Sequence, residues 1–213
     1  WTGMRIGDVV SEGVGLPVVV ENDANAFGWA EARFGAARGK RNALIVAIGT
    51  GVGGAIIVDG HLLRGWLGLT GEVGHMPVEP EGLKCRCGRR GCWETRSGLQ
   101  ALTSAYPPGD AVRDETTSLD ERIGAGDAEL TRRLELSQQA LARALAILED
   151  VLNPQVIVLS GYLAAFADVF VSPTASILKD RLLDQRAAVR LETSHLGQWA
   201  SSHGAALVAL ESV

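Results

Sequence analysis

ALIVAIGTGVGGAIIVDG, residues 43–60, is the stretch of this chain that decides its fold class. Two aliphatic, β-branched runs, 43–48 and 55–58, flank a glycine-rich segment at 49–54, which predicts a strand, a turn and a second strand. An Asp-Gly dipeptide follows the second run and is a strong signal for a hairpin turn. We therefore expect two strands joined by a glycine turn, with a further hairpin turn directly after them.

Strands and helices alternate on both sides of this stretch. Upstream, 16–20 is a short apolar run that indicates a buried strand, and 26–34 indicates a helix that ends before Gly35. Downstream, leucines at helical spacing make 127–152 the longest expected helix, and 155–160 indicates a strand. The remaining expected elements are helices at 97–105, 163–171, 175–183 and 202–210, a polar segment with helical pieces at 109–126, and an edge strand at 189–192. This alternation predicts an α/β architecture.

Composition and charge narrow the class of protein. Hydrophobic residues make up 46% of the 213 positions and charged residues 21%, which is typical of a globular chain. The formal net charge of −5 argues against this chain gripping a nucleic-acid backbone by itself. No apolar run approaches the roughly 18 residues of a membrane span, so we expect no membrane partner.

All three cysteines lie close together and follow a histidine, in the pattern His75-x9-Cys85-x-Cys87-x4-Cys92. Three thiolates and one imidazole make a closed tetrahedral site that suits structural zinc. Three unrelated buried thiols are a weaker reading, and a disulfide would leave one of the three thiols over. Four protein ligands leave no open position for a catalytic water, so the metal should shape a site and not perform chemistry. Such a thiolate site fits a reducing cytoplasm.

Two other segments could carry chemistry. The Asp23 carboxylate stands where a strand is expected to end and a helix to begin, and it could take a proton from a substrate hydroxyl. The alternative is that Asn22 or Asp23 only caps the helix. The glycines of 49–54 would let the backbone approach phosphate oxygens, although a plain glycine-rich hairpin explains them equally well.

Two glutamates flank the cysteine pattern. Glu72 lies three residues before His75, and Glu94 lies two residues after Cys92. A zinc ion that holds His75 and Cys92 would fix the positions of Glu72 and Glu94 relative to one another. Carboxylates and imidazole edges suit a molecule with several hydroxyl groups, because each can accept a hydrogen bond from an O–H group.

Taken in order, the segments 21–25, 49–54 and 71–75, the cysteine pattern and Glu94 closely resemble the ROK family of repressors, open reading frames and kinases. The resemblance implies an actin-like, hexokinase-like (ribonuclease H-like) fold of two α/β lobes. It also implies a sugar site formed by Asn22, Asp23, Glu72, His75 and Glu94, in which Asp23 is the catalytic general base. The nucleotide phosphates would face Gly49, Thr50, Gly51 and Gly53, and the adenosine would lie beside Gly161. His75 would use one ring nitrogen for zinc and the other for the sugar.

The chain departs from the family pattern in two ways. The Asp-Gly-Gly-Thr phosphate motif and the rest of the N-terminal lobe are absent, and the chain starts at Trp1. We therefore expect residues 1–213 to be the C-terminal portion of a ROK sugar-binding domain, with a zinc-binding insert at about 71–96. In addition, Tyr162 stands where kinases of the family commonly carry glycine, and it would crowd a nucleotide.

Residues 92–95, Cys-Trp-Glu-Thr, resemble the ROK regulators of high-GC Gram-positive bacteria, in which a helix-turn-helix domain precedes the sugar-binding lobes. This favours the sugar-sensing region of a transcriptional regulator. The alternative is an ATP-dependent sugar kinase of the glucokinase or N-acetylhexosamine kinase type, which would use ATP and Mg²⁺. The expected partners are a small sugar or amino sugar and further copies of the chain in a dimer or tetramer. DNA would be contacted only through a domain outside this chain.

Overall fold

The computed structural model describes residues 3–103, 115–161, 164, 166–182, 190–197 and 199–212. Helices and strands are mixed along the chain, as the α/β prediction requires. The elements are α1 (Ile6–Val14), α2 (Asp23–Phe34), β1 (Ala43–Ile48), β2 (Val52–Val58), β3 (His61–Leu62), the 3-10 helix η1 (Val73–His75), α3 (Glu94–Ser97), α4 (Leu99–Thr103), α5 (Glu115–Gly124), α6 (Ala128–Leu152), β4 (Val156–Gly161), α8 (Ala167–Lys179), β5 (Leu191–Thr193) and α9 (Ala200–Glu211).

The five strands form one sheet in the order β3-β2-β1-β4-β5. The hairpin strands β1 and β2 are antiparallel, with Ala43 opposite Ile57 and Ile48 opposite Val52. On its other side β1 pairs in parallel with β4, and β5 extends the sheet in parallel at the edge. The carboxyl ends of β1, β4 and β5 therefore meet at one edge of the sheet, which is where open α/β sheets bind ligands.

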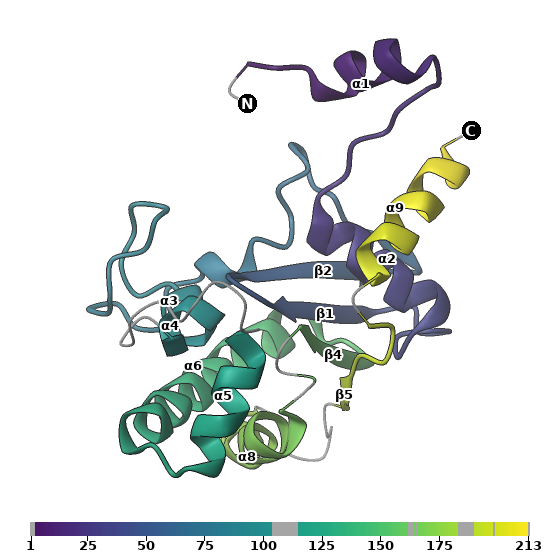
Figure 1. The fold of residues 1–213 in the computed structure, drawn as a ribbon. Helices are drawn as coiled ribbons and strands as arrows, with labels where there is room; N and C mark the ends of the chain where they lie inside the picture. The colour runs from purple at the N-terminus through teal and green to yellow at the C-terminus, as the bar shows by residue number, and fades with distance from the viewer. Residues whose placement is uncertain are drawn as a thin grey trace.

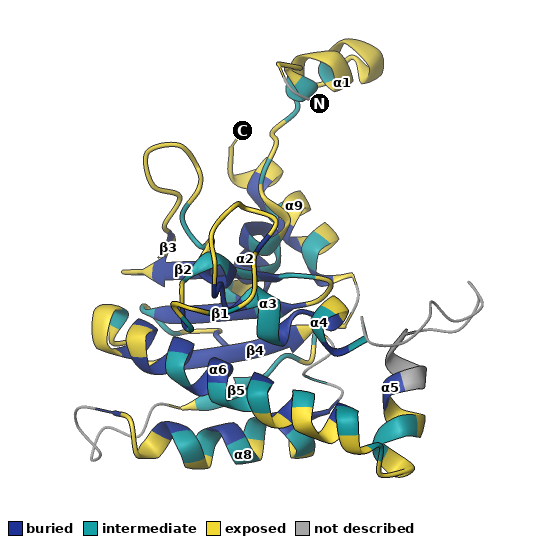
Figure 2. Ribbon diagram, turned by 90° about the vertical axis from the view of Figure 1, so that its left-hand side faces the viewer, coloured by how far each residue is buried: buried dark blue, intermediate teal, exposed yellow. Residues whose placement is uncertain are grey.

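Helices cover both faces of this sheet (Figure 1). Leu44 and Val46 of β1 belong to the core that α6 and α8 complete, whereas Ile45 belongs to the core that α2 and α9 complete. Successive side chains of a strand point to opposite faces, so a strand between two helical layers must be apolar throughout. This explains the unbroken aliphatic run of 43–48, which is buried in Figure 2.

Close packing of α9 on α2 closes one face of the sheet. A Cβ atom on Gly204 of α9 would lie 1.6 Å from the Ala26 carbonyl oxygen, so only glycine permits this approach. At the far end of the pair, the Trp29 indole N–H donates to the Glu211 carboxylate at 2.9 Å. The helix α2 is thereby held with its N-terminus at the ligand-binding edge of the sheet.

Most of the expected elements are confirmed. The 43–48 strand and the long helix agree closely, because Asp127 caps α6 and Asn153 ends it in the left-handed conformation. Asp59 and Gly60 both have positive φ, as a two-residue hairpin turn requires. The strand expected at 155–160, the edge strand and the final helix are also present.

Several boundaries differ from the prediction. The second hairpin strand begins at Val52 and so includes part of the glycine run, because the sheet hydrogen bonds continue through Gly53 and Gly54. The described part of the helix expected at 97–105 is two short helices, α3 and α4, and α5 occupies most of the described part of 109–126. Residues 104, 105 and 109–114 lie outside the described residues. One helix, α8, passes through Pro173 where two helices were expected, and residues 163, 165 and 183 lie outside the described residues.

The prediction of a buried strand at 16–20 is wrong. These residues form no strand, and Leu16, Val19 and Val20 are exposed. A strand needs a neighbouring strand for its backbone hydrogen bonds, and within the described residues no such neighbour pairs with this segment. The helix before it, α1, was not predicted; none of its residues is buried (Figure 2). None of the helices in the described part of the chain is long and apolar enough to cross a membrane.

Candidate functional site

A cavity of about 760 Å³ lies at the carboxyl ends of β1 and β4, beside the start of α2. The residues that sequence analysis selected for sugar and nucleotide contacts all line it, although they come from five separate segments. They are Asn22, Asp23, Gly49, Thr50, Gly51, Gly53, Glu72, His75, Glu94 and Gly161. Tyr162 lies outside the described residues.

The start of α2 presents Asp23 to this cavity. The Asn22 side-chain oxygen accepts hydrogen bonds from the backbone N–H groups of Ala24 at 2.9 Å and Asn25 at 3.1 Å, so Asn22 is the N-cap. The exposed Asp23 follows in the first turn, and one of its oxygens accepts from the Ala24 N–H at 2.9 Å. Because Asn22 performs the capping, the Asp23 carboxylate remains accessible from the cavity.

A glutamate that sequence analysis did not select holds this turn in place. Glu21 accepts hydrogen bonds from the Asn22 backbone and the Asn25 amide, each at 3.0 Å, and its other oxygen forms a 2.7 Å ion pair with Arg64. Burial raises the pKa of Glu21, but the hydrogen bonds from Asn25 and Arg64 outweigh it and hold the pKa below its ordinary value. Arg64 is 43 positions away in the chain, so spacing could not reveal this partner.

The glycine turn after β1 is closed by hydrogen bonds within the protein. The Gly49 N–H donates to the Gly51 carbonyl at 2.9 Å, and the Val52 N–H donates to the Glu94 carboxylate at 3.3 Å. A Cβ atom on Gly51 would lie 2.3 Å from Glu94 Oε2, so any side chain here would displace the Glu94 carboxylate. Two of the turn's backbone donors are therefore already used.

Serine residues from the far side of the sheet complete the cavity. Ser194 follows β5, Ser201 lies in α9, and Ser160 lies in β4 with a buried hydroxyl that has no hydrogen-bond partner among the described residues. Sequence analysis missed these residues because the topology of the sheet, and not any local pattern, brings them to the cavity.

The side chains of His75, Cys85, Cys87 and Cys92 come together next to the cavity. Their ligand atoms all lie within 4.8 Å of one another, an arrangement compatible with a metal site. His75 Nδ1 is 3.6 Å from Cys85 Sγ, and Cys87 Sγ is 3.6 Å from Cys92 Sγ. All three cysteines are free thiols, which rules out the disulfide alternative in this structure.

The three thiols have different surroundings. Hydrogen bonds from the Arg89 backbone and then from its side chain lower the pKa of the exposed Cys87 to about 6. Burial raises the pKa of Cys92 to about 12, and the neighbouring thiols add to this. A metal cation would favour the thiolate form of all of them, because a coordinating thiol is deprotonated outright.

Two side chains that line the cavity, His75 and Glu94, also contact the cysteines. His75 turns Nδ1 toward the cysteines, while its Nε2 lies 3.7 Å from the Glu72 carboxylate at the cavity wall. Glu94 lines the cavity and lies 3.7 Å from both Cys85 Sγ and the Arg86 guanidinium. Any ion bound by the cluster would therefore fix the position of His75 and lie close to Glu94.

Comparison with known proteins gives a consistent result. Residues 1–212 match the model of the ROK family. The chain is 34% identical to the glucokinase of Streptomyces coelicolor, over 99% of this chain and 73% of the relative. It is 29% identical to the xylose repressor of Bacillus subtilis, over 99% of this chain and 55% of the relative.

Among solved structures, the chain superimposes on a ROK family glucokinase from Streptomyces griseus in complex with glucose and AMPPNP. The TM-score is 0.84, with 31% identity, over 99% of this chain and 74% of that one. The α/β sheet described above is thus part of the actin-like, hexokinase-like fold that this structure has. The chain belongs to the ROK family.

Proposed function

We propose that the cavity binds a small sugar or amino sugar through Asn22, Asp23, Glu72, His75 and Glu94. The observation that carries this proposal is the convergence of these five polar side chains on one cavity of about 760 Å³. Asn22, Asp23, Glu72 and Glu94 offer oxygens that can accept a hydrogen bond from a hydroxyl group. With its Nδ1 on a metal, His75 would donate a hydrogen bond from Nε2 to a hydroxyl oxygen. Several acceptors around a preformed concave site are what a ligand with many hydroxyls requires.

We further propose that His75, Cys85, Cys87 and Cys92 hold one structural zinc ion. A tetrahedral zinc ion with bonds of about 2.3 Å to sulfur and about 2.0 Å to nitrogen places its ligand atoms about 3.5 to 3.8 Å apart. The two 3.6 Å separations within the cluster fit this geometry. The ion would supply no chemistry beyond bracing the loop, and its thiolate ligands favour a reducing compartment such as the cytoplasm.

For the use of the bound sugar, we propose effector sensing by a transcriptional regulator. The glycine turn supports this, because Gly49 and Val52 already donate their N–H groups to protein oxygens. One of those oxygens belongs to the Glu94 carboxylate, so the Val52 N–H is not left for a phosphate oxygen. The similarity to the xylose repressor along 99% of this chain is consistent with this role. DNA binding would then require a domain outside these residues, and a dimer or tetramer would be the functional unit.

The second candidate is an ATP-dependent sugar kinase, and the accessible Asp23 carboxylate favours it. In that case Asp23 would be the general base for the sugar hydroxyl. Gly49, Thr50, Gly51 and Gly53 would face the phosphates of ATP and its Mg²⁺, and Gly161 would lie beside the adenosine. The similarity to the glucokinases supports this candidate.

An assay of the full-length gene product separates the two candidates. ATP is supplied with glucose, N-acetylglucosamine, N-acetylmannosamine and xylose in turn, and ADP release is measured. We expect sugar binding by calorimetry without sugar-dependent ADP release. Sugar-dependent ADP release that is lost in D23N and kept in the control D59N would refute the regulator and establish the kinase. Asp59 is a suitable control because it is exposed in the β2–β3 turn.

A further inference from the structure

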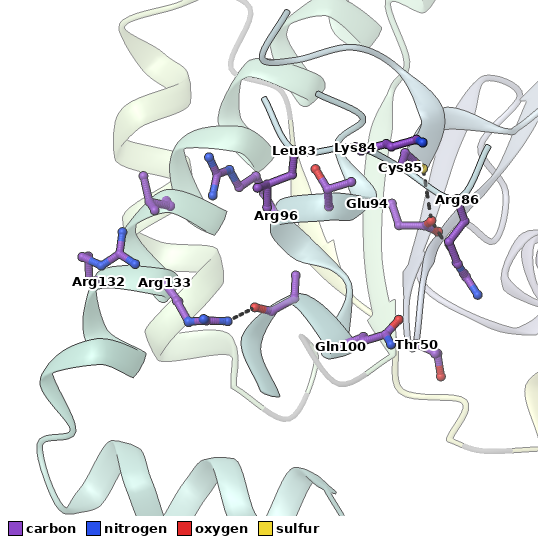
Figure 3. Close-up of a pocket in the computed structure, with 13 residues that line it drawn as sticks. Thr50, Leu83, Lys84, Cys85, Arg86, Glu94, Arg96, Gln100, Arg132 and Arg133 are labelled. Atoms are coloured by element: carbon purple, nitrogen blue, oxygen red, sulfur yellow. Dashed lines mark hydrogen bonds and ion pairs between the residues drawn. The ribbon is translucent and has the colours of Figure 1, made fainter. Parts of the chain in front are cut away.

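A second cavity, of about 420 Å³, lies against the cysteine loop, residues 76–93, and Figure 3 shows the residues that line it. It adjoins the cavity that we propose to bind a sugar, called the sugar cavity below. The cysteine loop, α3, α4 and α6 enclose it. Its cationic lining residues are Lys84, Arg86, Arg96, Arg132 and Arg133. Glu94 is the single carboxylate among the residues that line it. Five cations around one cavity contrast with the formal net charge of −5 for the chain.

Neighbouring glutamates orient the arginines on one side of the cavity. Glu129 binds Arg132 at 2.9 Å and Arg133 at 2.8 Å, and Glu79 binds Arg96 at 2.8 Å. In Figure 3 Arg132 and Arg133 lie across the view from Lys84 and Glu94, and Arg96 lies between the two sides. A guanidinium carries five N–H donors, so Arg96 and Arg132, each held by one carboxylate among the described residues, retain donors for a second acceptor. Arg133 also donates to the Ala101 carbonyl at 2.6 Å, so it contributes mainly its charge.

Enough positive charge remains for an anion. Among the described residues, Arg96 donates only through Nε, and the Lys84 ammonium forms no ion pair. Within the described part of the chain, the carboxylates that line the cavity or pair with its arginines are Glu79, Glu94 and Glu129, and counting them against the five cations leaves two positive charges. A planar guanidinium group can donate two parallel hydrogen bonds to two phosphate oxygens, whereas a lysine ammonium acts as a point charge.

The shape of the cavity favours a small ligand. Leu83, Ala101 and Leu136 give it an apolar wall beside the cations. A concave site of a few hundred Å³ with mixed lining suits a small organic molecule, whereas a nucleic-acid backbone needs an extended basic surface. Thr50 and Glu94 line this cavity and the sugar cavity alike.

We propose that this basic cavity binds the phosphate monoester group of a small metabolite, at a site separate from the sugar cavity. The proposal rests on the lining residues and not on the proposed function of the neighbouring cavity. Free inorganic phosphate and a hexose phosphate offer the same group, so both serve as probes.

Calorimetric titration of the 213-residue chain tests this proposal, with inorganic phosphate, glucose 6-phosphate, glucose and a short DNA duplex as separate probes. The test variant is K84Q/R132Q, whose two side chains are exposed. The control variant is R38Q/K179Q, which removes the same charge at exposed positions elsewhere. The single variant K84Q breaks no ion pair among the described residues and provides a second measurement should the double variant fold poorly.

We expect at least one phosphate probe to bind to the wild type. Its affinity should fall about tenfold or more in K84Q/R132Q, because each charged hydrogen bond contributes about a factor of ten. The affinity should also fall in K84Q and should not change in R38Q/K179Q. Glucose binding should not change in the test variant. Three results would overturn the proposal: no binding of either phosphate probe, equal binding by the test variant, or loss of DNA binding alone in that variant.

Discussion

The contact between Gly51 and Glu94 makes the account testable with one methyl group. A Cβ atom at position 51 would lie 2.3 Å from Glu94 Oε2 and 3.3 Å from its Cδ. In the variant G51A the carboxylate must therefore retreat by about 1 Å to reach ordinary contact distance. The hydrogen bond that Glu94 accepts from the Val52 N–H is already 3.3 Å long, and this retreat would break it.

The magnitude follows from the groups involved. Losing a hydrogen bond to a charged group costs about 1.5–3 kcal/mol, and the partly exposed carboxylate places G51A near the lower end for stability. If Glu94 also accepts a hydrogen bond from the sugar, its displacement costs a similar amount in binding, or about 10- to 100-fold in Kd. Calorimetric titration with the preferred sugar measures the affinity, and urea unfolding measures the stability.

Gly49 provides a matched control in the same turn. A Cβ atom on Gly49 would have no atom within 4 Å, so G49A adds the same methyl group without displacing Glu94. We expect G49A to bind sugar as the wild type does, with a stability change of at most about 1 kcal/mol. Equal sugar affinity in G51A and G49A would refute the reasoning that places Glu94 on the sugar.

Three further predictions concern the metal loop, the acid stability and the core. The variant C87S should lose its zinc and the ordered structure of 72–94, measured as metal content and protease resistance; full zinc occupancy in C87S would contradict the ligand assignment. Hydrogen bonds from Arg132 and then Arg133 lower the pKa of Glu129 from 4.5 to about 2, so its contribution is present above about pH 4.5 and is lost toward pH 2. Urea unfolding at a series of pH values should show a shallower acid slope for E129Q, and an unchanged slope would contradict this. The variant L145A should lose about 2–5 kcal/mol of unfolding free energy, against about 0.5 kcal/mol for the exposed control V151A, and equal losses would contradict the core assignment.

Local patterns predicted the elements whose stability is itself local. The helix α6 was placed within one residue at each end, because Asp127 caps it and Asn153 followed by proline ends it. The predicted bounds of β1 agree with the structure at both ends, because a strand that is buried on two faces has an unbroken apolar sequence. The strand expected at 16–20 failed for the opposite reason: strand formation depends on a distant partner, and β-branched residues alone do not supply one.

The candidate site divides in the same way. The sugar-contact candidates and the cysteine cluster could be selected from the sequence, because most of these residues lie close to one another in short, recognisable motifs. Glu21 could not be assigned its role, because its ion pair depends on Arg64 far along the chain. Ser194 and Ser201 line the cavity only because β5 and α9 return to the sheet edge. Residues that topology alone brings to a site carry no local signal.

Binding of a small sugar or amino sugar in the cavity beside the cysteine cluster can be tested by one calorimetric comparison. Wild-type chain, E72Q and the control E81Q are titrated with a panel of hexoses, pentoses and N-acetylhexosamines. Glu72 lines the cavity, whereas Glu81 is exposed on the cysteine loop and does not line it. We expect saturable binding of at least one sugar to the wild type and to E81Q, and binding about tenfold weaker to E72Q. Absence of binding across the panel, or equal affinity in E72Q, would contradict it.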